Sequence, residues 1–291
     1  VLDAYNKLSH YTSAAPLTGE AAIQAQMIEA AWNNPEAIAE YTDKGLVPLN
    51  PFVTSGNYWA ACNSEGTSAD DWKGRQIRIG GSAQTPISEG IGASPVSMEY
   101  GEAFEALQRG TVDCSFVQGM VAGSTGLLEA APHVSTFGEE RMTGAVTAGH
   151  VAGSSFEQLP LPYQQIIFDA AGIDWFHGQI AAIVSSSADA VADVREAGGS
   201  FTEMDQEVEE NILATQEEID DGLIADGVIE ESNREALKES APVWEGVVEE
   251  LGYTDDGELA ELDQWYDAEG TDFRPLAERV FEKGAIEHRP S

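Results

Sequence analysis

Arg78 is the residue whose type and position point most directly to chemistry. It is one of 14 basic residues in a chain of 291, against 51 acidic ones. It lies in the run Gln76-Ile77-Arg78-Ile79, which predicts a strand ending at Gly80-Gly81. A guanidinium matches a carboxylate bidentately, and open α/β sheets bind ligands at the carboxyl ends of their strands. Position alone leaves two partners for Arg78 open, a ligand carboxylate or a structural Asp or Glu.

The patterns of other chemistries are missing from the sequence. Gly80-Gly81 is followed by no Lys-Ser/Thr pair of a phosphate loop, and neither Gly-x-Gly-x-x-Gly nor Gly-x-Ser-x-Gly occurs. The histidines have no metal-ligand spacing. His150 lies on a strand that we expect to cross between two domains. Its side chain either packs in the interior or contacts a ligand, and the sequence leaves both roles open. We therefore expect no catalytic constellation, no metal and no cofactor.

The elements on either side of Arg78 would position it. Residues 70–118 follow a strand–helix–strand–helix–strand order, which predicts an α/β fold. After the strand 76–79, the expected elements are a helix over about 84–91, a strand over 95–98, a helix stopped by Gly110 and a strand over 112–117.

The rest of the chain carries further signals. Asn34-Pro35 predicts a helix start, and Pro48 marks residues 46–49 as an edge strand. Residues 143–151 predict a strand returning through a hinge. Residues 196–291 hold 29 of the 51 acidic residues but keep apolar residues at helical spacing, so we expect packed helices. The apolar residues that carry this pattern are Val208, Ile212, Leu213, Val243, Val247, Val248 and Leu251.

The charge balance excludes some partners. A formal net charge of -37 disfavours nucleic acid and anionic lipid, and no apolar run is long enough to span a membrane. The charge suggests salt adaptation, because concentrated salt screens self-repulsion; a merely soluble acidic surface is the alternative. Cys62 and Cys114 are too few for a disulfide scaffold or a zinc site. We favour two buried free thiols over a disulfide, which an oxidising compartment would permit.

Two stretches carry a family resemblance. Residues 73–79, KGRQIRI, and residues 92–113, GASPVSMEYGEAFEALQRGTVD, resemble the DctP-type periplasmic solute-binding proteins of TRAP transporters. The spacing of the second block from Arg78 makes the resemblance specific. Weaker similarity continues through residues 156–160, FEQLP, and fades after about residue 205.

The resemblance implies roles for several residues. The arginine at the position of Arg78 clamps the substrate carboxylate in this family, and an aromatic residue at the position of Tyr100 faces the ligand. Tyr58 and Trp59 lie where some sialic-acid-binding members have a second arginine, which favours a smaller or more apolar acid here. Gln118 is a substitute for the family's polar Asn contact. With His150, these are the candidate ligand-binding residues.

The resemblance also implies the architecture, which is periplasmic-binding-protein-like. Two α/β domains are joined by hinge strands, with a helix-rich C-terminal region. We expect domain I over residues 1–55 and about 144–184, domain II over 56–143, and an acidic helical region over 185–291 that packs on both. Compared with the family pattern, we expect the leading strand–helix–strand of domain I to be missing.

The function implied is an extracytoplasmic receptor, periplasmic or extracellular. It would bind an organic acid, such as a C4-dicarboxylate, and deliver it to TRAP-type membrane subunits for ion-driven uptake. We expect it to do no chemistry and to insert into no membrane. Two alternatives stay open, a hydrolase that uses a carboxylate pair in the same cleft and a ligand-sensing module of a larger protein.

Overall fold

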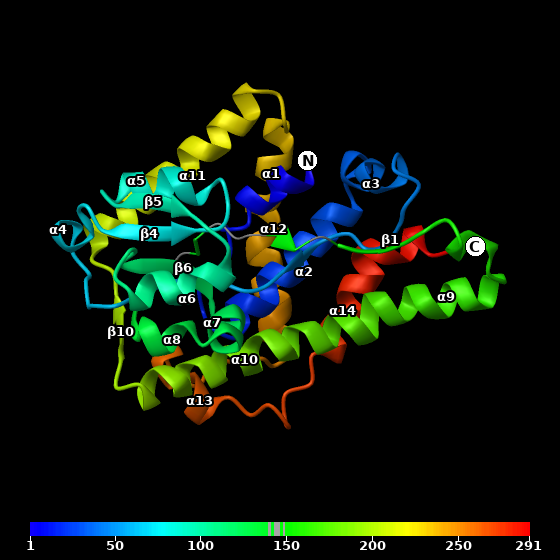
Figure 1. Cartoon of the computed structure of the whole chain (residues 1–291). Helices are drawn as coiled ribbons and strands as arrows, with labels where there is room; N and C mark the ends of the chain where they lie inside the picture. The colour runs from blue at the N-terminus through cyan, green and yellow to red at the C-terminus, as the bar shows by residue number, and fades with distance from the viewer. Residues whose placement is uncertain (139–140, 143–145, 148) are drawn as a thin grey trace.

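The computed structural model describes residues 1–138, 141–142, 146–147 and 149–291, with residues 146–147 as backbone only. Figure 1 shows a part built on a sheet and a largely helical part. A helical run that includes α9 (Leu161–Asp169) and α10 (Phe176–Glu196) extends along both. In the described ranges, no helix combines the length and apolar character that crossing a membrane requires.

A mixed six-stranded sheet holds Arg78, in the order β10-β7-β3-β6-β4-β5. β4 (Gln76–Ile79) pairs in parallel with β5 (Ser94–Ser97) and with β6 (Cys114–Gln118). The central strand β3 (Tyr58–Cys62) runs antiparallel to β6 and to β7 (His133–Thr136), and β10 (Ser200–Glu203) forms an edge beside β7. The expected α/β fold is confirmed: the strands expected over 76–79, 95–98 and 112–117 are β4, β5 and β6, with bounds shifted by at most two residues, whereas β3, β7 and β10 were not predicted as strands.

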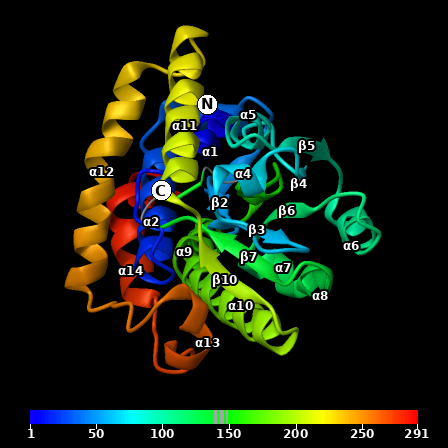
Figure 2. The same cartoon turned by 90° about the vertical axis from the view of Figure 1, so that its left-hand side faces the viewer.

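Helices cover both faces of this sheet (Figures 1 and 2). One face buries Tyr58, Cys62 and Phe116, and the other buries Trp59 and Val117. The first face is covered by α4 (Ala69–Trp72), α5 (Gln84–Gly90) and α11 (Gln206–Ala225). The second face is covered by α6 (Tyr100–Gln108), α7 (Gly119–Thr125), α8 (Leu127–Ala130) and α10.

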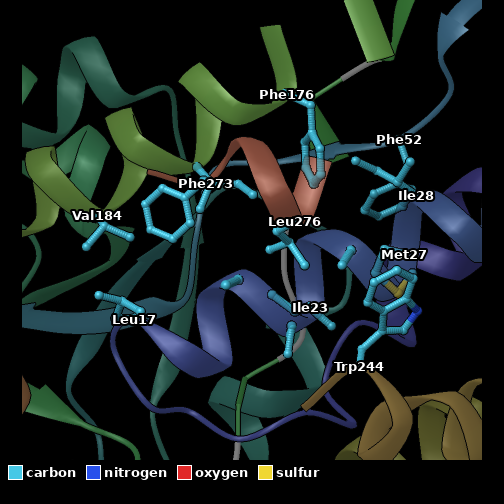
Figure 3. Close-up of a cluster of buried hydrophobic side chains, with 14 of the residues drawn as sticks. Leu17, Ile23, Met27, Ile28, Phe52, Phe176, Val184, Trp244, Phe273 and Leu276 are labelled. Carbon is cyan, nitrogen blue, oxygen red and sulfur yellow. The ribbon is translucent and has the colours of Figure 1, made fainter. Parts of the chain in front are cut away.

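The helical part is built around α2 (Thr18–Trp32), most of whose residues are buried. α12 (Glu231–Glu250) and α14 (Arg274–Val280) pack against it. Figure 3 shows Ile23, Met27 and Ile28 of α2 among side chains from other segments. These side chains are Leu17, Phe52, Phe176, Val184, Trp244, Phe273 and Leu276. The core therefore joins residues from most of the length of the chain.

Two short antiparallel ribbons lie beside α2. β1 (Val47–Asn50) pairs with β9 (His150–Ala152), and β2 (Val53–Thr54) pairs with β8 (Val146–Thr147). The edge position expected for the strand with Pro48 is confirmed, because a two-stranded ribbon has only edges. Of the returning strand expected over 143–151, residues 143–145 and 148 lie outside the described residues.

The start of α3 (Pro35–Thr42) and the acidic C-terminal region largely follow their sequence signals. The Asn34 side chain accepts hydrogen bonds from the backbone N–H groups of Glu36 and Ala37, as an N-cap does. α11 and α12 bury most of their expected apolar positions. Val243 is an exception: it is 51% exposed on α12, so its predicted packing is wrong.

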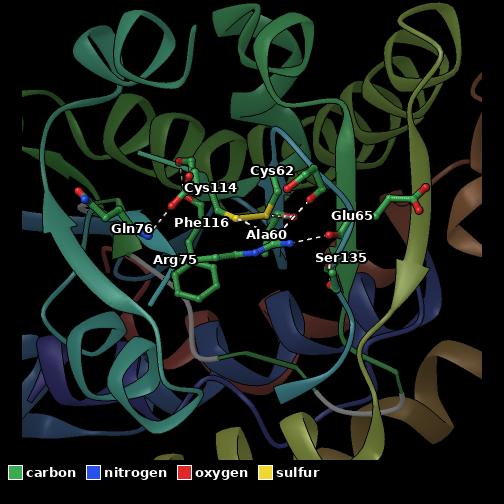
Figure 4. The surroundings of a disulfide bond; sticks show 12 residues. Ala60, Cys62, Glu65, Arg75, Gln76, Cys114, Phe116 and Ser135 are labelled. Carbon is green, nitrogen blue, oxygen red and sulfur yellow. Dashed lines mark hydrogen bonds between the residues drawn. A yellow bond between two sulfur atoms is a disulfide. The ribbon is translucent and has the colours of Figure 1, made fainter. Parts of the chain in front are cut away.

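Cys62 and Cys114 form a disulfide, so the preference for two free thiols is wrong. The residues lie opposite each other in the β3–β6 pair, with Cα atoms 4.0 Å apart, and both are fully buried. The Arg75 guanidinium lies beside them, with Nη1 3.6 Å from the Cys114 sulfur (Figure 4). The sequence predicted that both cysteines are buried. It could not predict that they lie opposite each other, because that depends on how two distant strands pair.

Candidate ligand-binding site

β4 carries Arg78 into the interior of the molecule, where its side chain is 2% exposed. Nε donates a hydrogen bond to the Met98 carbonyl at 2.9 Å, and Nη1 donates to the Phe116 carbonyl at 3.3 Å. A Cβ atom at Gly80 would lie 2.9 Å from Nη2, so this position leaves the guanidinium the room it needs. The ends of three strands thus hold Arg78 in place.

An aromatic ring and an amide complete the surroundings of Arg78. The guanidinium carbon lies 3.6 Å from the centroid of the Tyr100 ring, a cation–π contact. The Tyr100 hydroxyl donates to Gln118 Oε1 at 3.1 Å, and Tyr58 lies opposite Gln118 in the β3–β6 register. Burial raises the pKa of both tyrosines, which keeps their hydroxyls protonated at neutral pH. The structure thus brings together four of the predicted residues.

Among the described residues, the charge of Arg78 has no carboxylate partner. In the part of the chain that the structure describes, no Asp or Glu oxygen lies within 4.0 Å of its guanidinium nitrogens. Arg141 is equally inaccessible at 4%, yet its Nη2 lies 2.6 Å from Glu20 Oε2. Burying an unpaired cation is costly. Arg78 is therefore set up to receive an anion that the described chain does not supply.

Trp59 packs in the core of the molecule. Successive side chains of a strand point to opposite faces, so Trp59 lies across the sheet from Tyr58. It is 3% exposed, and its ring packs edge-on against Phe201, with centroids 5.6 Å apart. Its indole also fills the space at Gly119. Trp59 is a core residue in this structure, and a contact between Trp59 and a ligand stays a prediction.

His150 lies in a separate cavity of about 540 Å³ between the two short ribbons and α10. Its ring contacts Trp175, with ring centroids 3.4 Å apart, and burial lowers its pKa. The cavity is lined by Val53, Thr54, Ser55, Met120, His150, Asp174, Trp175, Gly178, Gln179 and Ala182. Met120 lines this cavity and follows Gln118 by two residues. The cavity therefore lies close in sequence to one of the residues that surround Arg78.

Comparison with known families identifies the chain. A sequence profile of the DctP family, described as bacterial extracellular solute-binding protein, family 7, matches residues 20–223. The chain belongs to this family. The resemblance to DctP-type solute-binding proteins of TRAP transporters is thereby confirmed. A comparison with curated protein sequences finds no match for this family member.

Solved structures share the fold of this DctP-family chain at low sequence identity. The periplasmic ectoine-binding protein of the TeaABC TRAP transporter of Halomonas elongata is 21% identical, with a TM-score of 0.56, over 75% of this chain and 72% of that one. A TRAP periplasmic solute-binding protein from Desulfovibrio desulfuricans with bound sn-glycerol-3-phosphate is 18% identical, with a TM-score of 0.60, over 80% and 72%. One from Roseobacter denitrificans with bound beta-D-glucuronate is 17% identical, with a TM-score of 0.57, over 77% and 75%. The periplasmic-binding-protein-like fold is thereby confirmed.

Two features near the site were not foreseen from the sequence. Gln84 accepts hydrogen bonds from the backbone of Gly80 and Gly81, directly beyond β4. The Arg141–Glu20 pair joins segments far apart in the chain. A polar residue just after Gly80-Gly81 was a usable signal for Gln84, whereas nothing local marks Arg141 as the partner of Glu20. Among described residues, no group of three His, Cys, Asp or Glu is arranged to hold a metal ion.

Proposed function

We propose that this chain is an extracytoplasmic receptor for an organic acid, which it delivers to TRAP-type membrane permease subunits. The receptor binds and releases its ligand without chemical change. It acts in the periplasm or outside the cell, and C4-dicarboxylates are among its candidate ligands.

The buried guanidinium of Arg78, which no carboxylate of the described residues neutralises, carries this proposal. A carboxylate bound there would accept two parallel N–H bonds in a site shielded from water, where a charged pair is strong. Tyr100, Tyr58 and Gln118 would surround the ligand with a ring and neutral polar groups. The glucuronate and glycerol phosphate named for two structural neighbours are both anions, which supports an anionic ligand.

Ligand entry requires a rearrangement, because Tyr100 covers Arg78. We propose that Tyr100 moves off the guanidinium when the two domains separate and returns over the bound acid. The domains would be residues 1–55 with about 144–184, and residues 56–143, with 185–291 packing on both. Contacts made only in the closed state would then shift the open–closed equilibrium. The two short ribbons beside the cavity of His150 would serve as the hinge in this proposal.

Thermal melting against a panel of mono- and dicarboxylic acids and uronates tests the proposal. A ligand present at about 100 times its dissociation constant adds about 2.7 kcal/mol to the free energy of unfolding, which raises the melting temperature. Arg78→Met keeps a long side chain but removes the charge. Arg109→Met is the matched control, because Arg109 is 73% exposed and its ion pair is with Glu105 one turn away.

We expect at least one acid to raise the melting temperature of the parent and of Arg109→Met. The same acid should leave the melting temperature of Arg78→Met unchanged. A shift that survives in Arg78→Met would move the site elsewhere. Conversion of the bound acid to a product would indicate an enzyme instead. An ordered parent that responds to no acid in the panel would contradict a carboxylate receptor of this class.

A further inference from the structure

The two sulfur atoms of the Cys62–Cys114 bridge have unlike surroundings. The Cys114 sulfur lies 3.6 Å from Nη1 of Arg75, whereas the Cys62 sulfur lies 3.8 Å from the carbonyl oxygen of Ala60 (Figure 4). Both cysteines are fully buried and lie opposite each other on β3 and β6. A neighbouring cation stabilises a thiolate, whereas the partial negative charge of a carbonyl oxygen does not. When the bridge opens, negative charge is therefore favoured on Cys114.

The guanidinium of Arg75 is held beside the bridge by neutral groups. Nη1 also donates to the carbonyl of Ser64 at 3.1 Å, and Nη2 donates to the carbonyl of Glu65. A Cβ atom at Gly66 would lie 2.5 Å from Nη2, so this glycine leaves the guanidinium its place. The ring of Trp72 lies 5.3 Å from the guanidinium carbon. These contacts position the charge without neutralising it.

Among the described residues, no carboxylate oxygen lies within 4.0 Å of the Arg75 nitrogens. Arg109, Arg195 and Arg234 each have such a partner, as expected in a chain with 51 acidic residues. Asp71 lies farther away: its pKa is lowered chiefly by its hydrogen bonds with Ser68, and the charge of Arg75 contributes less. The positive charge of Arg75 is thus available to a thiolate at Cys114.

The layer that covers the bridge on this side is thin. Arg75 is half-buried, and the two residues whose carbonyls hold it, Ser64 and Glu65, are exposed in the loop that follows β3. A movement of this loop and of the Arg75 side chain would admit a small thiol while β3 and β6 stay paired.

We propose that the Cys62–Cys114 bridge is a site of thiol–disulfide exchange with a dithiol reductant, in which Arg75 stabilises Cys114 as the leaving thiolate. One thiolate of the reductant attacks the Cys62 sulfur, the S–S bond breaks, and its electron pair stays on Cys114. The second thiolate of the reductant then attacks the reductant's own sulfur in the mixed disulfide and releases Cys62.

Electrons and protons balance in this exchange. Two electrons pass from the dithiol to the bridge, and the reductant becomes a disulfide. Of the two protons that the dithiol loses, one goes to Cys62 and one goes to the solvent, because Cys114 stays a thiolate beside Arg75. Stabilising the reduced form in this way makes a disulfide easier to reduce.

The bridge lies next to the candidate ligand-binding site in the sheet. In the β4–β6 pair, Cys114 is opposite Ile77, and the next residue, Ser115, is opposite Arg78. Opening the bridge therefore removes a covalent tie one position away from Arg78 along β6.

Equilibration in mixtures of reduced and oxidised dithiothreitol between about pH 6 and 8 tests the proposal, because ordinary thiols are mostly protonated there. Free thiols are counted by mass spectrometry after acid quenching and alkylation, and near-ultraviolet circular dichroism reports whether the reduced protein stays folded. Arg75→Gln keeps hydrogen-bond donors for the loop carbonyls but removes the charge, and Arg75→Lys keeps the charge. Arg279→Gln is the control, because it removes a positive charge from α14 in the helical part, where Arg279 pairs with Glu250.

We expect the equilibrium constant for reduction of the parent to rise toward about tenfold per pH unit, because one proton is released to the solvent. Arg75→Gln should lose this pH dependence and be about tenfold harder to reduce near pH 8, because the charge that favours the thiolate is gone. Arg75→Lys should keep much of the pH dependence, and Arg279→Gln should behave as the parent does.

Three results would overturn the proposal. The first is an equilibrium constant of the parent that does not change with pH, and the second is an equal pH dependence in the parent and in Arg75→Gln. The third is a bridge that dithiothreitol opens only as the near-ultraviolet signal is lost. Should Arg75→Gln fail to fold, the pH dependence of the parent decides. None of these results depends on whether the chain binds an organic acid.

Discussion

Arg141 and Glu20 lie 121 positions apart and form a buried ion pair, with Nη2 2.6 Å from Oε2. Glu20 Oε2 also accepts from the Asn57 N–H at 3.2 Å, just before β3. Gln216 of α11 donates to the Arg141 carbonyl at 3.2 Å. One carboxylate thus ties α2 to two of the stretches through which the chain passes between the sheet and the helical part.

Removing one member of this pair should destabilise the protein strongly. Glu20→Gln leaves Arg141 buried without a counter-charge, which should cost about 3–5 kcal/mol in the free energy of unfolding. Urea denaturation measures the loss. Glu105→Gln, which breaks an exposed pair with Arg109, should cost under about 1 kcal/mol. The double variant Glu20→Gln with Arg141→Met should recover part of the loss. If Glu20→Gln lowered the free energy of unfolding no more than Glu105→Gln does, the Arg141–Glu20 pair would not have the stabilising role expected here.

Reduction of the Cys62–Cys114 disulfide should also lower stability. The bridge closes a loop with a sequence separation of 52, for which chain entropy predicts about 4 kcal/mol. We expect the urea midpoint to fall in reductant once free thiols are detected. The variant with Ala at both positions should have the lower urea midpoint from the outset, and reductant should not change it. An unchanged midpoint in the reduced parent would show that the sheet does not depend on the bridge.

The sequence predicted the features of this fold that depend on a few neighbouring residues better than those that depend on the pairing of distant segments. The caps at Asn34 and the strand ending at Gly80-Gly81 are encoded within a few residues, and the structure has both. The positions of Arg78 and Tyr100 followed from motif spacing. The Cys62–Cys114 bridge, the Arg141–Glu20 pair and the orientation of Trp59 depend on the register between distant segments. Apolar and polar types in the sequence do not specify that register.

The protonation of His150 should make stability depend on pH. Burial lowers its pKa, so between that pKa and about 6.5 the unfolded chain binds more protons than the folded one. Stability therefore falls as the pH drops below about 6.5. His150→Gln lacks this component and should gain on the parent in melting temperature between about pH 7.5 and 5.5. Parallel profiles for the two proteins would assign the acid sensitivity to other groups.

The excess of acidic residues should make the protein more stable in salt. With a net charge of -37, repulsion weakens as the Debye length shrinks from about 10 Å at 0.1 M to about 3 Å at 1 M. Exposed ion pairs lose little over this range because each contributes little. We expect the melting temperature to rise with sodium chloride beyond any rise in sucrose of equal osmolality. A flat or falling curve would leave the acidic surface without a role in salt adaptation.

The alternation along β3 has an evolutionary consequence. Tyr58 and Trp59 are adjacent, yet the proposed function gives Tyr58 a part in recognition, whereas Trp59 belongs to the core beneath α7 and α10. If Tyr58 has that proposed part, its substitution would change which solute is preferred and leave the packing across the sheet intact, whereas a substitution of Trp59 would disturb its contacts with Gly119 and Phe201. A one-residue insertion in this strand would exchange the two roles at once. New ligand preferences in this lineage should therefore arise by substitution on this strand, while its length is preserved.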